Sequence, residues 1–265
     1  MTETLLDVEN LSVCYDGVQV LEKVSFSLQK GQILGIVGES GSGKSTLIKA
    51  VMGILDGGII TEGTIFFKGK DLAELTEKEY RRMRGPEMGM VFQDCRAALC
   101  PIRKLKDQIY ESMAEHQKIS RKKVYEQAAE LMDKIGLTDY KRVLESYPFE
   151  LSGGMNQRVG ICMAMMQHPD LLLADEPTSA LDMTVQKQVV EEFLLMRREY
   201  GTAMILVTHN IGVAEKMSDQ ILVLKNGKQM DYGETSQVLK SSQNPYTRKL
   251  MDSVLHLKRC GEEYK

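Results

Sequence analysis

Residues 33–45 run Ile33-Leu34-Gly35-Ile36-Val37-Gly38-Glu39-Ser40-Gly41-Ser42-Gly43-Lys44-Ser45 and decide the fold. The first five form a short apolar run, typical of a buried strand, and a helical pattern follows from Thr46 to Val51. The glycine-rich part matches G-x-x-x-x-G-K-S/T, with the strand before it and the helix after it that a phosphate-binding loop requires. A glycine-rich turn that happens to contain Lys-Ser would not explain this context. We therefore predict an α/β protein that binds a phosphorylated ligand.

The predicted loop offers donors from both backbone and side chains. Its glycines allow successive backbone N–H groups to turn inward, and the start of the helix adds a partial positive charge. We expect Lys44 to reach the β- and γ-phosphates and the Ser45 hydroxyl to ligate Mg²⁺. The residues expected around the phosphates are Gly38, Ser40, Gly41, Ser42, Gly43, Lys44, Ser45 and Thr46.

Length and composition narrow the class of protein. A chain of 265 residues can form one large domain, or a domain with a subdomain, around a buried core. The net charge of −3 gives no broad basic surface for nucleic acid, although a small basic patch is compatible with that total. The five cysteines are odd in number and scattered, which favours reduced thiols. They are Cys14, Cys95, Cys100, Cys162 and Cys260.

The amino terminus and the hydropathy give no membrane signal. Residues 1–4 lack the basic and apolar regions of a signal peptide, and no apolar run is long enough to span a bilayer. We expect a soluble protein that reaches a membrane only through a partner.

Strand patterns surround the loop. Residues 5–15 and 24–28 alternate apolar and polar side chains, with a turn at Asp16-Gly17, and a strand at 64–68 follows a loop at Gly57-Gly58. These segments predict a sheet that includes strands other than the buried one at 33–37.

Two residues at predicted strand ends have two readings each. Tyr15 either packs on the sheet or stacks on an adenine, and the sequence favours neither. Gln93 follows a buried strand at 88–92, at the carboxyl end, where ligands gather in open α/β sheets. It either holds a metal ion or water there or is an ordinary loop residue.

Residues 94–150 differ from the rest because strand patterns give way to helical periodicity. One apolar stripe indicates a helix that begins after Ser120 and ends at Gly136. We predict an inserted helical subdomain. The stripe is formed by Val124, Ala128, Leu131, Met132 and Ile135.

After this segment, the sequence contains a glycine motif at a predicted helix start and two carboxylates at a predicted strand end. Leu151-Ser152-Gly153-Gly154 precedes a helix from Met155 to Met166, which makes a second potential anion site at a helix start. A buried strand at 171–174 then ends in Asp175-Glu176. Two adjacent carboxylates there are costly without a cation, and Mg²⁺ is the simplest one beside a phosphate loop. Asp175 would act on the metal, and Glu176 would polarise an attacking water.

The last third continues the α/β pattern. Ser179-Ala180-Leu181-Asp182 leads into a helix from Thr184 to Tyr200, which ends at Gly201, and a buried strand at 203–207 ends in Thr208-His209. Of the four histidines, His209 is the one expected beside the γ-phosphate. Asn226-Gly227 predicts a type I′ hairpin turn, and a charged helical tail with a break at Asn244-Pro245 begins at Thr235.

Taken in order, these motifs resemble the ATP-binding subunit of an ATP-binding-cassette (ABC) transporter over nearly the whole chain. Leu-Ser-Gly-Gly between the phosphate loop and the acidic pair is close to diagnostic. The resemblance implies a P-loop NTPase core, with a mixed sheet flanked by helices and an antiparallel β subdomain, plus an inserted helical subdomain. The implied ranges are 1–93 for the first part of the core, 94–158 for the helical subdomain, 159–240 for the second part of the core and 241–265 for a C-terminal helical tail.

The resemblance also implies a mechanism in which two cassettes meet head-to-tail with ATP between them. Glu176 would be the general base, Lys44 and His209 would stabilise charge on the γ-phosphate, and Gln93 would sense metal and water. The Mg²⁺ ligands would be Ser45, Gln93 and Asp175. The remaining implied ATP contacts are Tyr15 at the adenine, Asp182, and Ser152, Gly153 and Gly154, which cap the nucleotide of the opposing subunit.

Finer features resemble importers of peptides and nickel, namely residues 38–44, 153–158, 208–210 and 244–248. The resemblance implies uptake of peptides or nickel ions at the cytoplasmic face of the plasma membrane. The implied partners are a second ATPase subunit, identical or more often related but different, two transmembrane permease subunits and, indirectly, an extracytoplasmic solute-binding protein. Nucleic acid is not expected. The alternative is an ABC ATPase that acts on DNA or ribosomes.

One segment departs from that subfamily. Cys95 and Cys100 stand where its members tend to have Pro and Asn, near the place where the membrane subunit docks in the family. The departure bears on the identity of the partner.

Overall fold

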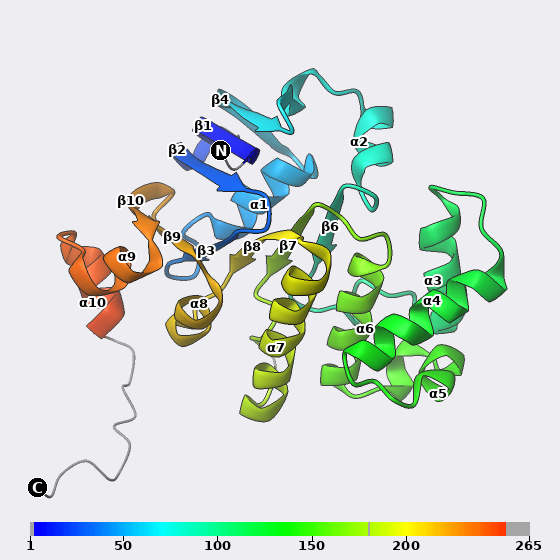
Figure 1. Cartoon of the computed structure of the whole chain (residues 1–265). Coiled ribbons are helices and arrows are strands. Elements are labelled where there is room, and N and C mark those ends of the chain that lie inside the picture. The colour runs from blue at the N-terminus through cyan, green and yellow to red at the C-terminus, as the bar shows by residue number, and fades with distance from the viewer. Residues whose placement is uncertain (1–2, 180, 253–265) are drawn as a thin grey trace, which may run out of the picture.

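The computed structural model of the chain describes residues 3–179 and 181–252. Their strands form one mixed sheet in the order β5-β4-β1-β2-β10-β9-β3-β8-β7-β6 (Figure 1). The strands are β1 (Thr4–Tyr15), β2 (Val18–Gln29), β3 (Ile33–Val37), β4 (Gly58–Phe67), β5 (Lys70–Asp71), β6 (Met88–Val91), β7 (Leu171–Asp175), β8 (Ala203–Val207), β9 (Gln220–Lys225) and β10 (Lys228–Glu234).

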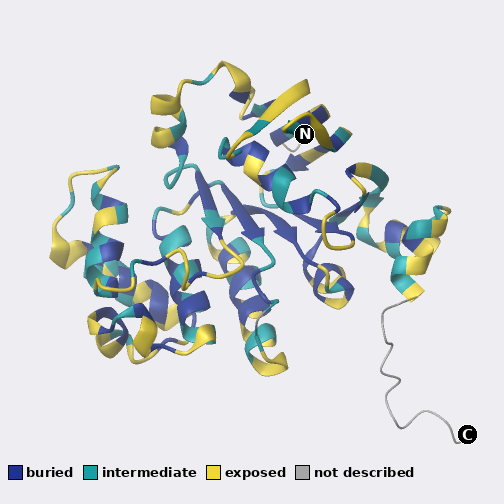
Figure 2. Cartoon of the chain, turned by 180° about the vertical axis from the view of Figure 1, so that it is seen from behind, coloured by how far each residue is buried: buried dark blue, intermediate teal, exposed yellow. Residues whose placement is uncertain are grey.

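One end of the sheet is parallel. β3 pairs in parallel with β8 and β9, and β7 pairs in parallel with β8 and β6. Every residue of β3 and β8 is buried, as expected of strands that are covered on both faces (Figure 2). The carboxyl ends of β3, β7 and β8 therefore lie at one edge, and the loops that begin at Gly38, Glu176 and Thr208 leave the sheet together.

The other end of the sheet is antiparallel, since β1 pairs with β2 and with β4. The β1–β2 connection has positive φ at Asp16 and Gly17, as a type I′ turn requires, so the predicted turn is confirmed. Both neighbouring strands begin earlier than the sequence predicts. Tyr15 pairs with Val18 of β2 and with Gly58 of β4, so pairing with β1 extends each strand across residues that local patterns assign to loops.

Between β6 and β7 the described chain contains helices and no strand, which confirms the predicted change to helical structure. Ser120 caps α4 through a hydrogen bond from the Lys123 amide, and Gly136 follows its end with φ +74°, both as predicted. The limits of the subdomains stay a prediction. The helices are α1 (Lys44–Met52), η1 (Leu72–Glu74), α2 (Glu77–Met83), α3 (Leu105–Ala114), α4 (Arg121–Lys134), α5 (Tyr140–Glu145), η2 (Pro148–Glu150), α6 (Gly153–Met165), α7 (Met183–Tyr200), α8 (Ile211–Met217), α9 (Thr235–Ser241) and α10 (Pro245–Asp252).

The core has no break between the inserted helices and the sheet. One cluster of buried side chains runs from α3, α4 and α5 through α6 and α7 to the strands, and a second fills the space between α1 and the antiparallel strands. The first cluster is rich in methionine, with seven buried methionines among the described residues against three in the second. The seven are Met113, Met132, Met165, Met166, Met196, Met204 and Met217.

Four of the cysteines are free thiols, namely Cys14, Cys95, Cys100 and Cys162, as the composition predicts, and Cys260 lies outside the described residues. Burial raises the pKa of Cys95 and of Cys162 to about 12, so both stay protonated at neutral pH. Among the described helices, none has the length and apolarity needed to cross a bilayer.

Candidate active site

The phosphate-loop sequence connects β3 to α1 and passes close to two other strands. Gly43, the N-cap of α1, has φ +97°, and a Cβ there would lie 2.6 Å from Cδ2 of Leu21. A Cβ on Gly38 would lie 2.2 Å from the carbonyl oxygen of Leu224. The loop can follow this path only with glycine at both positions, since a side chain would displace it from the sheet edge.

Lys44 lies folded over the loop that precedes it. Its Nζ donates hydrogen bonds to the carbonyl oxygens of Gly38 at 2.9 Å and Glu39 at 2.8 Å. Burial lowers the pKa of Lys44, while the negative charges of Glu176 and Asp175 act in the opposite direction. The loop therefore contains a buried ammonium whose partners are carbonyl groups, and an anion would be a stronger partner for it.

Ser45 and Asp175 connect the start of α1 to the end of β7. The Ser45 hydroxyl donates to Oδ1 of Asp175 at 2.9 Å. Burial is the main cause of the raised pKa of Asp175, with a contribution from the Glu176 charge, and the Ser45 hydrogen bond opposes the shift. Mg²⁺ prefers oxygen ligands, and three are available here: the Ser45 hydroxyl, the Asp175 carboxylate and the side-chain amide of Gln93. A cation would also offset the cost of burying the charged carboxylate. This donor set fits Mg²⁺ held jointly with phosphate oxygens.

Glu176 and His209 meet at the same edge. Oε2 of Glu176 lies 3.2 Å from Nδ1 of His209. Glu176 has φ +45°, a left-handed conformation that turns the chain sharply at the end of β7, and its amide donates to the Val207 carbonyl at 2.9 Å. The carboxylate is four-fifths buried while the imidazole is more than half exposed. The site thus presents a carboxylate beside a histidine open to solvent.

A hollow of about 300 Å³ lies over the loop and is lined by Lys44, Ser45 and Glu176 among others, but not by Asp175 or His209. Ser42 Oγ is buried in the loop and has no hydrogen-bond partner among the described residues, so it can serve an oxygen-rich ligand without losing a contact there. The lining residues are Val20, Ser40, Gly41, Ser42, Gly43, Lys44, Ser45, Thr46, Gln93 and Glu176. The structure therefore brings Gln93 and Glu176, predicted from separate motifs, onto the phosphate loop.

The second glycine motif lies elsewhere in the chain. Ser152 caps α6, with Oγ accepting from the Met155 amide at 3.3 Å, and Gly153 lines another hollow, of about 440 Å³, together with Gln93. Asp182 caps α7 and accepts from the amides of Thr184 and Val185. None of Ser152, Gly154 and Asp182 lines the hollow over the phosphate loop.

Tyr15 ends β1 with its ring against Gly58, where an added Cβ would lie 2.6 Å from the ring carbon Cζ. The ring is partly buried and packs on the core of the antiparallel strands. It is a strand aromatic in this structure, and its stacking on an adenine stays a prediction.

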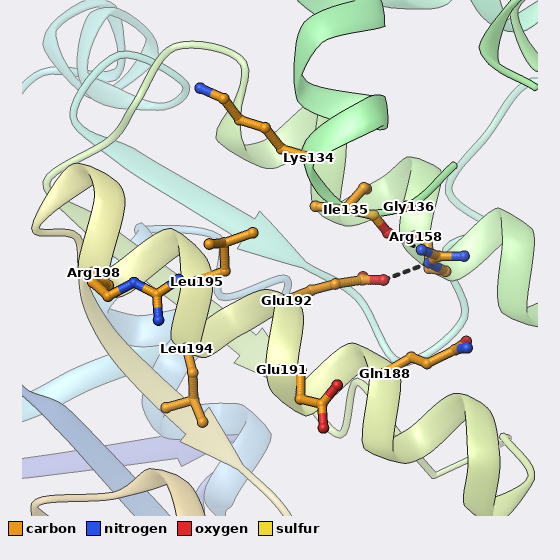
Figure 3. Close-up of a pocket in the computed structure, with 10 residues that line it drawn as sticks. All are labelled: Lys134, Ile135, Gly136, Arg158, Gln188, Glu191, Glu192, Leu194, Leu195 and Arg198. Atoms are coloured by element: carbon orange, nitrogen blue, oxygen red, sulfur yellow. Dashed lines mark hydrogen bonds and ion pairs between the residues drawn. The ribbon is translucent and has the colours of Figure 1, made fainter. Parts of the chain in front are cut away.

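The structure contains a buried ion pair that the sequence pattern did not indicate. Arg158 of α6 donates to Oε1 of Glu192 on α7 at 2.5 Å and to the carbonyl of Ile135 at the end of α4, beside a hollow of about 580 Å³ (Figure 3). Burial raises the pKa of Glu192 to about 7 in spite of Arg158, and within the part of the chain that the structure describes its Oε2 has no hydrogen-bond partner. The pair thus joins the helix of the second glycine motif to α7 and α4. No local pattern identifies residues that meet from separate helices.

Comparison with known proteins agrees with this geometry. The ABC transporter family matches residues 21–179, which is more than half of the chain. The chain belongs to the ABC transporter family, and it is an ATP-binding ATPase subunit of that class.

Particular relatives are similar over nearly the whole chain. A dipeptide transport ATP-binding protein of Bacillus subtilis is 40% identical over 98% of this chain and 80% of its own length. An oligopeptide transport ATP-binding protein of Haemophilus influenzae is 39% identical over 96% of this chain and 80% of its own length.

Solved structures confirm the fold. An ATP-binding cassette described as a dimer in a post-hydrolysis state, bound to ADP and Pi, superposes with a TM-score of 0.77 at 27% identity. The match covers 87% of this chain and 99% of that one. The protein cbiO1 of Clostridium perfringens, described as part of an ABC transporter complex, gives a TM-score of 0.78 at 26% identity and covers 90% of this chain and 92% of its own.

Proposed function

We propose that this chain is the ATP-hydrolysing subunit of a peptide importer, and that Glu176 is its general base. The observation that carries the assignment of the base is the position of Glu176, because it lines the hollow over the phosphate loop and contacts His209. A carboxylate there can accept the proton of a water that attacks the γ-phosphate. His209 holds the carboxylate at the strand end and can stabilise charge on the transferred phosphoryl group.

Lys44, Ser45, Asp175 and Gln93 bind and orient the nucleotide in this proposal. Lys44 exchanges the carbonyls of Gly38 and Glu39 for β- and γ-phosphate oxygens. Ser45, Asp175 and Gln93 would hold Mg²⁺, which would neutralise part of the phosphate charge when bound.

The position of the second glycine motif supports a composite site. The α6 start with Ser152, Gly153 and Gly154 offers backbone donors, yet it does not line the hollow over the phosphate loop of its own chain. A second ATPase subunit in head-to-tail contact would bring the two together, with Asp182 at the same boundary. The dimeric cassette among the similar structures supports this arrangement.

The names of the relatives support peptides as the cargo, since both are peptide transport proteins. Nickel stays a prediction. We infer that the subunit works with a related ATPase subunit and two permease subunits at the cytoplasmic face of the plasma membrane, and receives its cargo through an extracytoplasmic solute-binding protein.

The test of the catalytic assignment is Glu176→Gln. Loss of the base should lower the ATPase rate about 100-fold or more while ATP binding stays intact. Because closed dimers then persist, ATP should shift the variant towards the dimer in size-exclusion chromatography with light scattering. Glu215→Gln, an exposed carboxylate on α8, is the matched control and should hydrolyse ATP like the original chain. Hydrolysis by Glu176→Gln at the original rate would show that Glu176 is not the base.

A second experiment separates transport from the nucleic-acid alternative. Purification from membranes should recover two polytopic membrane proteins with this chain, and recovery of rRNA or DNA in their place would contradict the proposal. Uptake of radiolabelled dipeptide against radiolabelled nickel would then identify the cargo.

A further inference from the structure

The last helix of the described chain, α10, reaches the phosphate loop. The amide of Glu39 donates to the hydroxyl of Tyr246, on α10, with 3.4 Å between the two atoms. The carbonyl of the same Glu39 accepts from Lys44 Nζ at 2.8 Å. Glu39 is thus contacted through its amide by the tail and through its carbonyl by the lysine of the loop.

Tyr246 is held in this position by the segment around it. Asn244 accepts from the amide of Tyr246 at 2.9 Å, and its side-chain amide donates to the Met230 carbonyl on β10 at 2.8 Å. Pro245 begins α10 directly after this cap, a position for which its fixed φ is suited. The side chain of Thr247 is wholly buried. The start of α10 is therefore fixed to the sheet, and the tyrosine that follows is aimed at the loop.

The end of β9 supports both the ring and the loop. Nζ of Lys225 lies 4.4 Å from the centroid of the Tyr246 ring, which is the geometry of a cation–π contact. The preceding residue, Leu224, has its carbonyl against Gly38 at the start of the loop. Lys225 therefore fixes the ring relative to the strand on which the loop rests.

We propose that Tyr246 is a positioning residue for ATP binding, with Asn244–Thr247 as the element that carries it. This rests on the proposed function of the loop. When phosphate oxygens take the Lys44 ammonium, Glu39 loses the lysine contact on its carbonyl. Tyr246 then keeps the peptide before Glu39 from rotating, so the loop retains the shape that binds phosphate. The tail of the chain is thereby part of the nucleotide site although it contacts no nucleotide.

The test is the Kd of the full chain for ATP in magnesium buffer, measured by titration calorimetry. Tyr246→Phe keeps the ring over Lys225 and removes the hydroxyl, so the Kd should rise about threefold, the value of one modest hydrogen bond. Tyr246→Ala also removes the ring and should raise the Kd about tenfold. The turnover rate at saturating ATP should stay within about twofold, since no group at the reacting atoms changes.

Tyr232→Phe is the matched control. The Tyr232 hydroxyl bonds the Ser27 carbonyl at 3.0 Å, so this variant also loses a tyrosine hydroxyl bound to backbone. It should lower the unfolding midpoint without changing the Kd for ATP. The unfolding midpoint of each Tyr246 variant shows whether α10 remains folded. If Tyr246→Ala does not fold, the Kd of Tyr246→Phe alone tests the role of Tyr246.

The outcomes separate the two proposals. The role of Tyr246 is supported if the original chain binds ATP, Tyr246→Phe binds it more weakly and Tyr232→Phe binds it as the original chain does. An unchanged Kd in both Tyr246 variants overturns that role and leaves the proposed function intact. If the original chain binds ATP no better than Lys44→Ala, the proposed function itself fails.

Discussion

His209 Nδ1 and Glu176 Oε2 lie 3.2 Å apart at the carboxyl edge of the parallel strands. The contact follows from the register of β7 and β8, in which Asp175 pairs with Val207, so that the residues after each strand emerge side by side. Of these two residues, Glu176 lines the hollow over the phosphate loop and His209 does not. We therefore expect the histidine to act on the reaction through the carboxylate that it contacts.

Replacement of His209 should slow hydrolysis more than it weakens binding. We expect His209→Ala to lower the ATPase rate of the assembled transporter about 10- to 100-fold and to leave the Kd for ATP within about twofold. The reason is that the substitution leaves Lys44 and the loop, the proposed nucleotide-binding groups, unchanged. His116→Ala serves as control, because His116 lies beside Gly85 and lines a different hollow. Equal rates for His209→Ala and the control would remove His209 from the mechanism.

Asp175 should account for the magnesium dependence of binding. Asp175→Asn can still accept the Ser45 hydrogen bond but loses the charge that attracts the metal. Mutation of a residue that merely hydrogen-bonds to a metal ligand lowers metal affinity about 10- to 100-fold. Loss of a ligand charge should therefore reduce the gain in ATP affinity that Mg²⁺ causes at least about tenfold. The measurement compares the Kd for ATP in MgCl₂ and in EDTA. A variant that keeps the full gain would show that Asp175 does not hold the metal.

Gly43 should tolerate a methyl group less well than a glycine in a similar conformation. Gly17 has φ +79° with open space around it, so Gly17→Ala should lose about 1 kcal/mol of unfolding free energy from backbone strain alone. Gly43→Ala adds a clash with Leu21 and should lose about 3 kcal/mol. Urea unfolding of the two variants checks the difference. Equal losses would mean that the loop does not rest against Leu21.

The Arg158–Glu192 pair should make stability depend on pH. The folded-state pKa of Glu192, about 7, lies above its ordinary 4.5, so the folded chain holds this proton more tightly than the unfolded chain. The resulting stabilisation is complete below about pH 4.5 and is lost as pH rises through 7, on the order of 3 kcal/mol in all. Glu192→Gln should flatten the fall in unfolding free energy between pH 5 and 7.

Glu191→Gln is the control for that measurement, because Glu191 is the exposed neighbour on the same helix. Its pH profile should match that of the original chain. A slope in Glu192→Gln as steep as in the control would place the titrating group elsewhere.

Features set by neighbouring residues could be predicted from the sequence. The cap at Ser120, the stop at Gly136 and the Asn226-Gly227 turn each depend on a few adjacent residues, and both residues of the turn have positive φ as expected. The phosphate loop is predictable for the same reason, since its glycines are required by local backbone geometry and by one close approach to the sheet.

Features that depend on pairing between distant segments could not be predicted. β4 begins at Gly58 because β1 offers Tyr15 as a partner, and glycine alone indicates a loop. Arg158 and Glu192 are 34 residues apart on separate helices, and Tyr246 meets Glu39 from the far end of the chain. The same holds for the site, where sequence order names Gln93 and Glu176 but only the folded sheet places them in one hollow.

The methionine-rich cluster joins the inserted helices to the sheet through side chains that can repack. Leucine and isoleucine interlock in few rotamers, whereas methionine is unbranched and refills irregular gaps when its neighbours shift. Met165 of α6 and Met196 of α7 belong to this cluster, and the Arg158–Glu192 pair joins the same two helices. The boundary thus combines an adaptable apolar layer with the buried Arg158–Glu192 ion pair. We expect the apolar layer to repack at low cost when α6 shifts slightly against α7, and the Arg158–Glu192 contact to resist larger displacements.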